Sequence, residues 1–168
     1  IKSIKARLPN GNKAKAELIY DQHATNPREG DNLGTILIAP NKAHWVASPD
    51  DIVDTSIPFG NSPYGHWGNL RREQLKLKKS EVVIAYPITK YEHGEISLQL
   101  GHKSGWDYTV SGFVYVTKET LRKCYGVDRI TKSIIERAKN CIQSELDMLT
   151  AWLNGECYGW CIKEYALT

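Results

Sequence analysis

The longest periodic segment of the sequence, residues 131–154, constrains the fold more than any other. Its apolar side chains recur every three or four positions, which is the spacing of one face of an α-helix. These residues are Ile135, Ala138, Ile142, Leu146, Leu149 and Leu153. Thr131 is a good N-cap, and Gly155 suits the end of the helix. The pattern therefore predicts one long helix with a single face turned toward a core.

Most of the remaining chain shows the alternation of apolar and polar residues that is typical of β-strands. Residues 82–90 and 95–100 are predicted to pair across a turn at 91–94. Further strands are expected at 35–39, 111–116 and 157–163, and a short helix at 117–123. We expect an α+β fold, in which a mainly antiparallel sheet packs one face against the long helix of the C-terminal half. The length of 168 residues predicts a single domain.

Residues 1–20 are predicted to form a basic β-hairpin. The dipeptide Asn10-Gly11 is a strong turn signal, and apolar residues alternate with charged ones on both sides of it. The charged positions include Lys5, Arg7, Lys13 and Lys15. The net charge of +3 comes from this segment, because the rest of the chain contains more acids than bases. Two interpretations stay open: the cations keep an exposed strand from pairing with other chains, or they contact phosphate groups.

Residues 40–69 are predicted to be an irregular loop region. They contain several prolines and glycines and little periodicity. A loop of this length is uncommon in a compact domain unless it has a function. We interpret it as a functional loop or as a segment that a partner orders.

The composition excludes several classes of protein. No apolar run approaches the roughly 18 residues that cross a bilayer, and no signal-peptide pattern is present. The four cysteines lack the close pairs of common zinc sites. We therefore expect a cytoplasmic protein that has no membrane contact, and we predict neither a metal nor a cofactor.

Several segments together resemble an uncharacterised protein family of phages and mobile elements. Residues 26–35, NPREGDNLGT, resemble its PR…DNLGTM segment, and residues 86–97, YPITKYEHGEIS, resemble YP…YDHSGIS. Residues 105–116, GWDYTVSGFVYV, resemble PWDSGQVGFIYV. Residues 125–130 and 153–159 resemble YGVKRIT and YLNGEVYGF. The segments follow the order of the family and span about two thirds of the chain, so the resemblance implies a shared fold.

The sequence also departs from the family pattern. Gly105 replaces the proline of PWDSG, residues 36–40 intervene before the next aromatic and basic residues, and residues 48–80 match no family segment. The family has no established activity, so the resemblance transfers no catalytic residue. What it implies is a setting: a small accessory protein of a phage or mobile element, of the kind that modulates host defence or nucleic-acid processing.

Three polar residues, Glu92, His93 and Asp107, are the candidates for catalysis. A histidine held by a carboxylate can act as a general base. The alternative is purely structural, because Glu92-His93-Gly94 also reads as a turn. No G-x-S-x-G, phosphate-binding loop or H-E-x-x-H motif accompanies these residues. Enzymatic activity is therefore uncertain, and we favour a protein without it.

Aromatic residues next to glycines are candidates for binding. Tyr64 and Trp67 lie in the irregular loop region, and Trp106 and Tyr108 follow a glycine. Aromatic rings stack on bases or anchor protein interfaces, and glycine lets the backbone approach a phosphate. The alternative for Trp106 and Trp160 is a place in the core. With the cations of the hairpin, the candidate binding residues are Tyr64, Trp67, Trp106, Tyr108, Lys5, Arg7, Lys13 and Lys15.

Two functions from different classes follow. The first is an accessory protein that binds and thereby inhibits or modulates a component of the host cell. A host protein is the expected partner, with nucleic acid or a nucleotide as the alternative. The second is a small hydrolase or nucleotide-processing protein centred on His93 and Asp107. We favour the binding protein, because the sequence offers no nucleophile or metal motif to accompany the polar residues.

Overall fold

The computed structural model describes residues 2–38 and 67–166 and confirms an α+β fold with two antiparallel sheets and one long helix. Where the sequence predicts one domain, the chain divides into two compact units. Residues 1–25 and 155–168 form the terminal unit, and residues 26–154 form the central unit. The division arises because the last strand pairs with the N-terminal hairpin and not with the central sheet.

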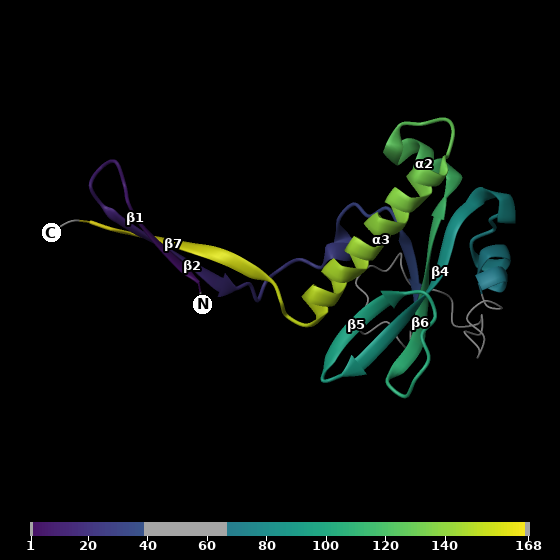
Figure 1. Ribbon diagram of the computed structural model, residues 1–168, viewed down its shortest axis with the longest axis horizontal. Helices are drawn as coiled ribbons and strands as arrows, with labels where there is room; N and C mark the ends of the chain where they lie inside the picture. Colours follow the sequence, from purple (N-terminus) through teal and green to yellow (C-terminus); the bar gives the residue numbers. More distant parts are fainter. Residues whose placement is uncertain (1, 39–66, 167–168) are drawn as a thin grey trace. The chain divides into compact units, whose positions relative to one another are not determined.

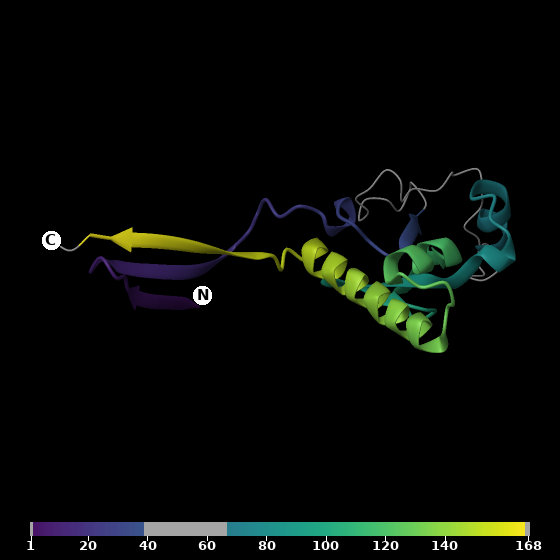
Figure 2. The same cartoon turned by 90° about the horizontal axis from the view of Figure 1, so that it is seen from above.

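The terminal unit is a three-stranded antiparallel sheet of β1 (Ser3–Arg7), β2 (Lys13–Tyr20) and β7 (Tyr158–Tyr165), in the order β1-β2-β7. Figure 2 shows the three strands side by side. The predicted hairpin is confirmed, since Arg7 lies opposite Lys13 and Ile4 opposite Ala16.

The hairpin turn differs from the two-residue type that Asn10-Gly11 favours. That type needs a positive φ at both central residues, whereas here only Gly11 has one, at 86°. The N–H of Gly11 donates to the carbonyl of Leu8, so Pro9 and Asn10 are the central residues of the turn. Gly11 then takes the left-handed position that follows, which is typical of a three-residue hairpin loop.

The central unit contains a four-stranded antiparallel sheet in the order β3-β6-β4-β5 (Figure 1). Its strands are β3 (Thr35–Ile38), β4 (Val82–His93), β5 (Glu95–Leu100) and β6 (Tyr108–Thr117). The helix α3 (Lys132–Leu153) packs against one face, and its N-cap is Thr131, as predicted. The short helix α2 (Lys118–Tyr125) is confirmed as well, with the N-cap Thr117 and a left-handed Gly126 at its end.

Both faces of the central sheet carry a buried cluster. The face toward α3 contributes side chains such as Ile36 and Val114, which pack with Ile142 and Leu146 of the helix. The adjacent residues of the two strands, Leu37 and Phe113, point the other way, because side chains alternate along a strand. They pack with Leu70, Trp67, Leu75 and Tyr115.

The segment that covers this second face differs from the expectation for the irregular region 40–69. Residues 67–69 are helical and continue into the π-helix η4 (Leu70–Gln74), followed by the 3₁₀-helix η5 (Lys79–Glu81). Residues 40–66 of the predicted loop lie outside the described part of the chain. Within the described part, no helix is long and apolar enough to cross a membrane.

The segment 26–35, one of those that resemble the family, is held against α3 by its contacts with Glu145, and we call this set of contacts the clamp. Asn26 accepts a hydrogen bond from the N–H of Arg28 in the 3₁₀-helix η1 (Pro27–Glu29). The Arg28 guanidinium, 3% exposed, donates to the carbonyl of Gly34 and lies 3.7 Å from the carboxylate of Glu145. That carboxylate also accepts hydrogen bonds from the backbone N–H groups of Leu33 and Gly34. The segment therefore has a structural explanation that needs no ligand.

Candidate functional site

The cations of the hairpin gather on one face of the terminal sheet, which we call the basic face. Lys5, Lys15 and Lys163 lie opposite one another across all three strands. Arg7 lies opposite Lys13 in the same way. Opposite residues share a face, and residues two apart along a strand share it too. The fold therefore brings these five cations together on a single surface.

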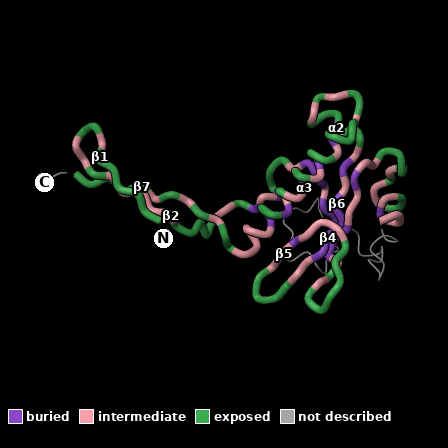
Figure 3. The backbone as a smooth tube through the Cα atoms, in the orientation of Figure 1, coloured by how far each residue is buried: buried purple, intermediate pink, exposed green. Residues whose placement is uncertain are grey.

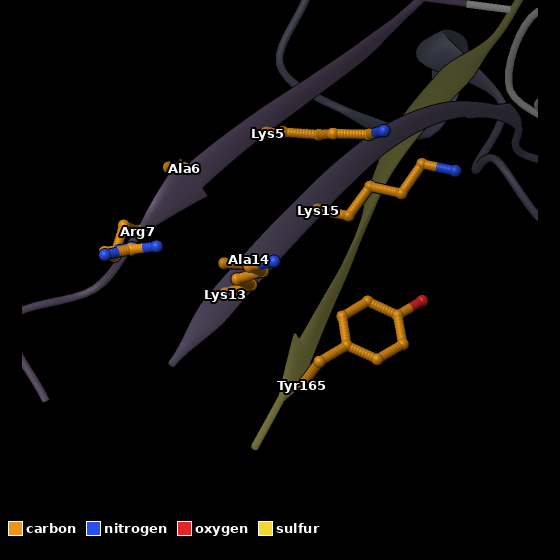
Figure 4. Close-up of a pocket in the computed structure, with 7 residues that line it drawn as sticks. All are labelled: Lys5, Ala6, Arg7, Lys13, Ala14, Lys15 and Tyr165. Atoms are coloured by element: carbon orange, nitrogen blue, oxygen red, sulfur yellow. The ribbon is translucent and has the colours of Figure 1, made fainter. Parts of the chain in front are cut away.

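The basic face holds an open pocket of about 530 Å³. It is lined by Lys5, Ala6, Arg7, Lys13, Ala14, Lys15 and Tyr165 (Figure 4). The side chains of Lys5 and Lys15 extend in the same direction from neighbouring strands. Tyr165 adds a phenol ring opposite Lys13. The pocket thus offers an anion several ammonium groups, one guanidinium and an aromatic surface.

One carboxylate, that of Glu17, accompanies the cations of the basic face. It forms an ion pair with Lys15. A hydrogen bond and the charge of Glu17 raise the pKa of Lys15, and the same pair lowers the pKa of Glu17. Both groups are therefore charged at neutral pH. Five cations against one anion leave the basic face with a clear positive excess.

Sequence reasoning names the four hairpin cations but misses Lys163 and Tyr165. These two residues come from β7, about 150 residues further along the chain. Cys161, Lys163 and Tyr165 are spaced two residues apart, so they lie on one face of a strand. Nothing in that pattern indicates that the strand pairs with the N-terminal hairpin.

The candidate catalytic residues are only partly brought together. The imidazole Nδ1 of His93 lies 3.7 Å from a carboxylate oxygen of Asp107, and the two side chains are 75% and 45% exposed. Glu92 does not join them, because adjacent residues of β4 point to opposite faces and Glu92 lies on the face away from His93. On that face the Glu92 carboxylate forms an ion pair with the Lys90 ammonium group at 3.1 Å. The turn expected at 91–94 is also tighter than predicted: β4 extends to His93, and Gly94 alone separates it from β5.

The ring of Tyr91 lies beside the imidazole of His93 on the same face of β4. Tyr91 lies opposite Tyr108, with ring centroids 5.0 Å apart, and its ring is 6.4 Å from that of His93. Tyr108 therefore packs within this small cluster. A 3.7 Å separation is longer than a hydrogen bond, and water screens an exposed pair. The geometry of His93 and Asp107 thus favours a surface turn over a preorganised catalytic base.

The tryptophans lie in different surroundings. Trp67 is half-buried, with its ring 5.4 Å from that of Tyr115 and 6.3 Å from that of Phe113, and its binding role stays a prediction. Burial in this cluster raises the pKa of Tyr115. Trp106 is fully exposed and Trp160 is 54% exposed, so the core placement considered for both is wrong. Tyr64 lies outside the described residues.

Possible metal ligands do not converge in the described part of the chain. Among residues 2–38 and 67–166, no group of three or more His, Cys, Asp or Glu side chains is arranged to hold a metal ion. The four cysteines are free thiols, and Cys124 is exposed.

Comparison with known proteins adds no relative to these observations. No family model, no curated protein and no solved structure matches the chain. The resemblance to a phage and mobile-element family therefore stays a prediction.

Proposed function

We propose that the protein acts by binding, and that its basic face contacts the phosphate backbone of a nucleic acid. The observation that carries the proposal is the row of Lys5, Lys15 and Lys163 across three adjacent strands, next to the pair Arg7 and Lys13. Like charges directly opposite one another destabilise a sheet. An arrangement that costs stability is explained most simply by an anionic ligand that neutralises it.

The shape of the terminal sheet also suits this partner. Sheets are used by several DNA-binding proteins, and the basic face spreads its cations over three adjacent strands. Lysine and arginine contribute most of the non-specific affinity for phosphate. Tyr165 stands beside the cations and can stack on a base or donate a hydrogen bond to a phosphate. A basic sheet with one aromatic group fits a backbone contact better than base-specific reading.

The test is a binding titration of a fluorescently labelled duplex and of the matching single strand, followed by anisotropy at several salt concentrations. If about four cations each contact a phosphate, the logarithm of the binding constant should fall against the logarithm of salt with a slope of about −3.6 for the duplex and about −2.8 for the single strand. The double variant Lys13→Glu with Lys15→Glu should abolish binding at moderate salt.

A matched control separates local contacts from net charge. Lys118 and Lys132 are exposed at the first turns of α2 and α3, where glutamate suits the helix dipole. Lys118→Glu with Lys132→Glu changes the total charge equally and should keep most of the affinity. The hairpin variant should also unfold no more easily than the wild type, because it removes cross-strand repulsion. Equal loss in both double variants, or a salt-independent affinity, contradicts the proposal.

A host protein is the second candidate partner, and the exposure of Trp106 favours it. Tryptophan is enriched among the residues that dominate protein interfaces, and a fully exposed one buries a large apolar area on binding. Trp106→Ala should then weaken a purified partner complex strongly while leaving nucleic-acid binding intact. The accessory role in a phage or mobile element that the resemblance implies is compatible with either partner.

A further inference from the structure

The face of the terminal sheet opposite the basic face is apolar, and we call it the apolar face. Five of its large side chains are between 51% and 72% exposed, and they come from all three strands. They are Ile4, Tyr20, Tyr158, Trp160 and Ile162. Figure 3 shows only exposed and intermediate residues along these strands. This face carries five of the nine exposed large apolar side chains of the described residues.

A sheet with an apolar face normally buries it against another element. Exposed apolar patches larger than a few hundred Å² mark interaction sites on monomers. Three aromatic rings and two isoleucines, each more than half exposed, present on the order of 500 Å². Two such faces packed together would bury about 1,000 Å², which is the lower bound for a specific interface. The area therefore suits a second sheet of the same size.

The register of β2 and β7 makes the apolar face complementary to itself, and we propose that a second copy of this chain packs on it. Along β7 the face carries Tyr158, Trp160, Ile162 and Glu164 in order. We place a two-fold axis in the plane between the two sheets, perpendicular to their strands and midway between Trp160 and Ile162. This axis reverses the strand direction, and with it the order of the four residues, in the second copy. Trp160 then meets Ile162, and Tyr158 meets Glu164.

The same operation fits the central strand. Leu18 lies opposite Trp160 and Ala16 opposite Ile162, so Leu18 of one copy meets Ala16 of the other. The small alanine leaves space for the leucine between the two sheets. Each contact occurs twice, as a two-fold interface requires.

The polar groups at the two ends of the apolar face are complementary too. Glu164 accepts hydrogen bonds from the side chains of Asn10 and Asn12, so its carboxylate is ordered at one end. Tyr20 and Tyr158 lie at the other end, with ring centroids 5.0 Å apart. A hydrogen bond with Tyr20 raises the pKa of Tyr158, which keeps the phenol protonated. Reversal of one copy brings this pair of phenols, of which one O–H stays free to donate, to the carboxylate of the other copy and separates the two carboxylates.

This inference does not rest on nucleic-acid binding, because the two proposals use opposite faces of the sheet. A face-to-face pair leaves both basic faces open, on its two outer sides. Loss of one property therefore leaves the other measurable.

The test is sedimentation of the full chain over a dilution series from micromolar to high-micromolar concentration. We expect a monomer–dimer equilibrium, and Trp160→Glu should weaken the association about thirtyfold or more, since a buried charge replaces a central aromatic anchor. Trp106→Glu is the matched control, because it makes the same change at an exposed site of the central unit and should dimerise like the wild type. Circular dichroism confirms that both variants keep their strands and helices.

A second pair of variants tests the register itself. Tyr158→Lys places an ammonium group against Glu164 of the second copy and should preserve or tighten the dimer. Glu164→Lys places an ammonium group against Tyr158, removes the acceptor and should weaken the dimer.

A wild-type chain that stays monomeric at all concentrations overturns the proposal. A dimer that survives Trp160→Glu also overturns it, because the contact then lies elsewhere, for example at the open edges of β1 and β7.

Discussion

The two sheets of this chain are both antiparallel but have opposite surroundings. The terminal strands β1 and β2 alternate apolar with charged side chains, whereas the central strand β3 reads TILI and has apolar residues on both of its faces. The central sheet is covered on one face by α3 and on the other by residues 67–75, and it contributes to two buried clusters. Among the described residues of the terminal unit, none is buried. Burial is therefore the property that separates a sheet that stabilises the chain from one that presents surfaces.

Apolar strand residues have two uses in this chain. In the central unit they contribute to the free energy of folding, because both faces of the sheet remove side chains from water. In the terminal unit the apolar face stays exposed, and its side chains contribute binding energy only when a partner covers them. Three substitutions, each with a counterpart, measure this difference in decreasing order of expected effect.

The largest effect is expected from removal of a buried side chain of α3. Leu146 is fully buried between the helix and the central sheet. Leu146→Ala should lower the free energy of unfolding by about 3 kcal/mol, because it loses apolar burial and leaves a cavity. Ile4→Ala, at an exposed position of the terminal sheet, should change it by less than about 0.5 kcal/mol. Urea unfolding of dilute protein measures both, and equal effects would show that the terminal sheet has a core after all.

A smaller effect is expected at the clamp between segment 26–35 and α3. Glu145→Gln removes the negative charge beside the buried Arg28 guanidinium. It also weakens the acceptor for the N–H groups of Leu33 and Gly34. We expect a loss of about 2 kcal/mol, since hydrogen bonds to charged groups contribute about 1.5–3 kcal/mol each.

The control for this clamp lies on the same helix. Glu136 forms an exposed pair with Lys139 at 3.1 Å, and exposed pairs contribute at most about 1 kcal/mol. Glu136→Gln should therefore leave the midpoint of thermal unfolding nearly unchanged. A similar shift in both variants would mean that the clamp adds nothing beyond an ordinary surface pair.

The smallest effects are expected from two strand glycines. A Cβ on Gly112 would lie 2.7 Å from the carbonyl oxygen of Leu37 and 2.9 Å from Ile38, whereas one on Gly159 would meet nothing within 4 Å. Gly112→Ala should cost about 1–2 kcal/mol by overpacking. Gly159→Ala should be neutral or stabilise by about 0.5 kcal/mol, because alanine has less freedom in the unfolded chain. Thermal unfolding compares the two, and a costly Gly159→Ala would reveal a close neighbour on the terminal sheet.

The local elements of both units could be predicted because their signals lie within short stretches of sequence. Thr131 and Thr117 cap the helices as predicted, and the apolar stripe of α3 faces the central sheet. The pairing of β4 with β5 follows from a short connection. The type of the hairpin turn was not predicted correctly. Pro9 and Asn10 occupy its central positions, one residue earlier than in the turn type that Asn10-Gly11 favours.

Placements that depend on distant segments could not be predicted. Trp67 and Trp106 both lie next to a glycine, yet one packs on Phe113 and the other is fully exposed. Side-chain type states how much apolar area is available but not whether another segment covers it. For the same reason the candidate trio separates, since the alternation along β4 places Glu92 and His93 on opposite faces.

The α+β class, the long helix and the two-faced character of the N-terminal hairpin follow from local patterns, because periodicity and capping act between residues a few positions apart. That β7 joins the hairpin and not the central sheet becomes visible only in the folded chain. That pairing completes the row of Lys5, Lys15 and Lys163 and sets Trp160 and Ile162 on the opposite face. Strand pairing between ends of a chain depends on which backbone groups meet in space, and no local pattern in the sequence records that choice.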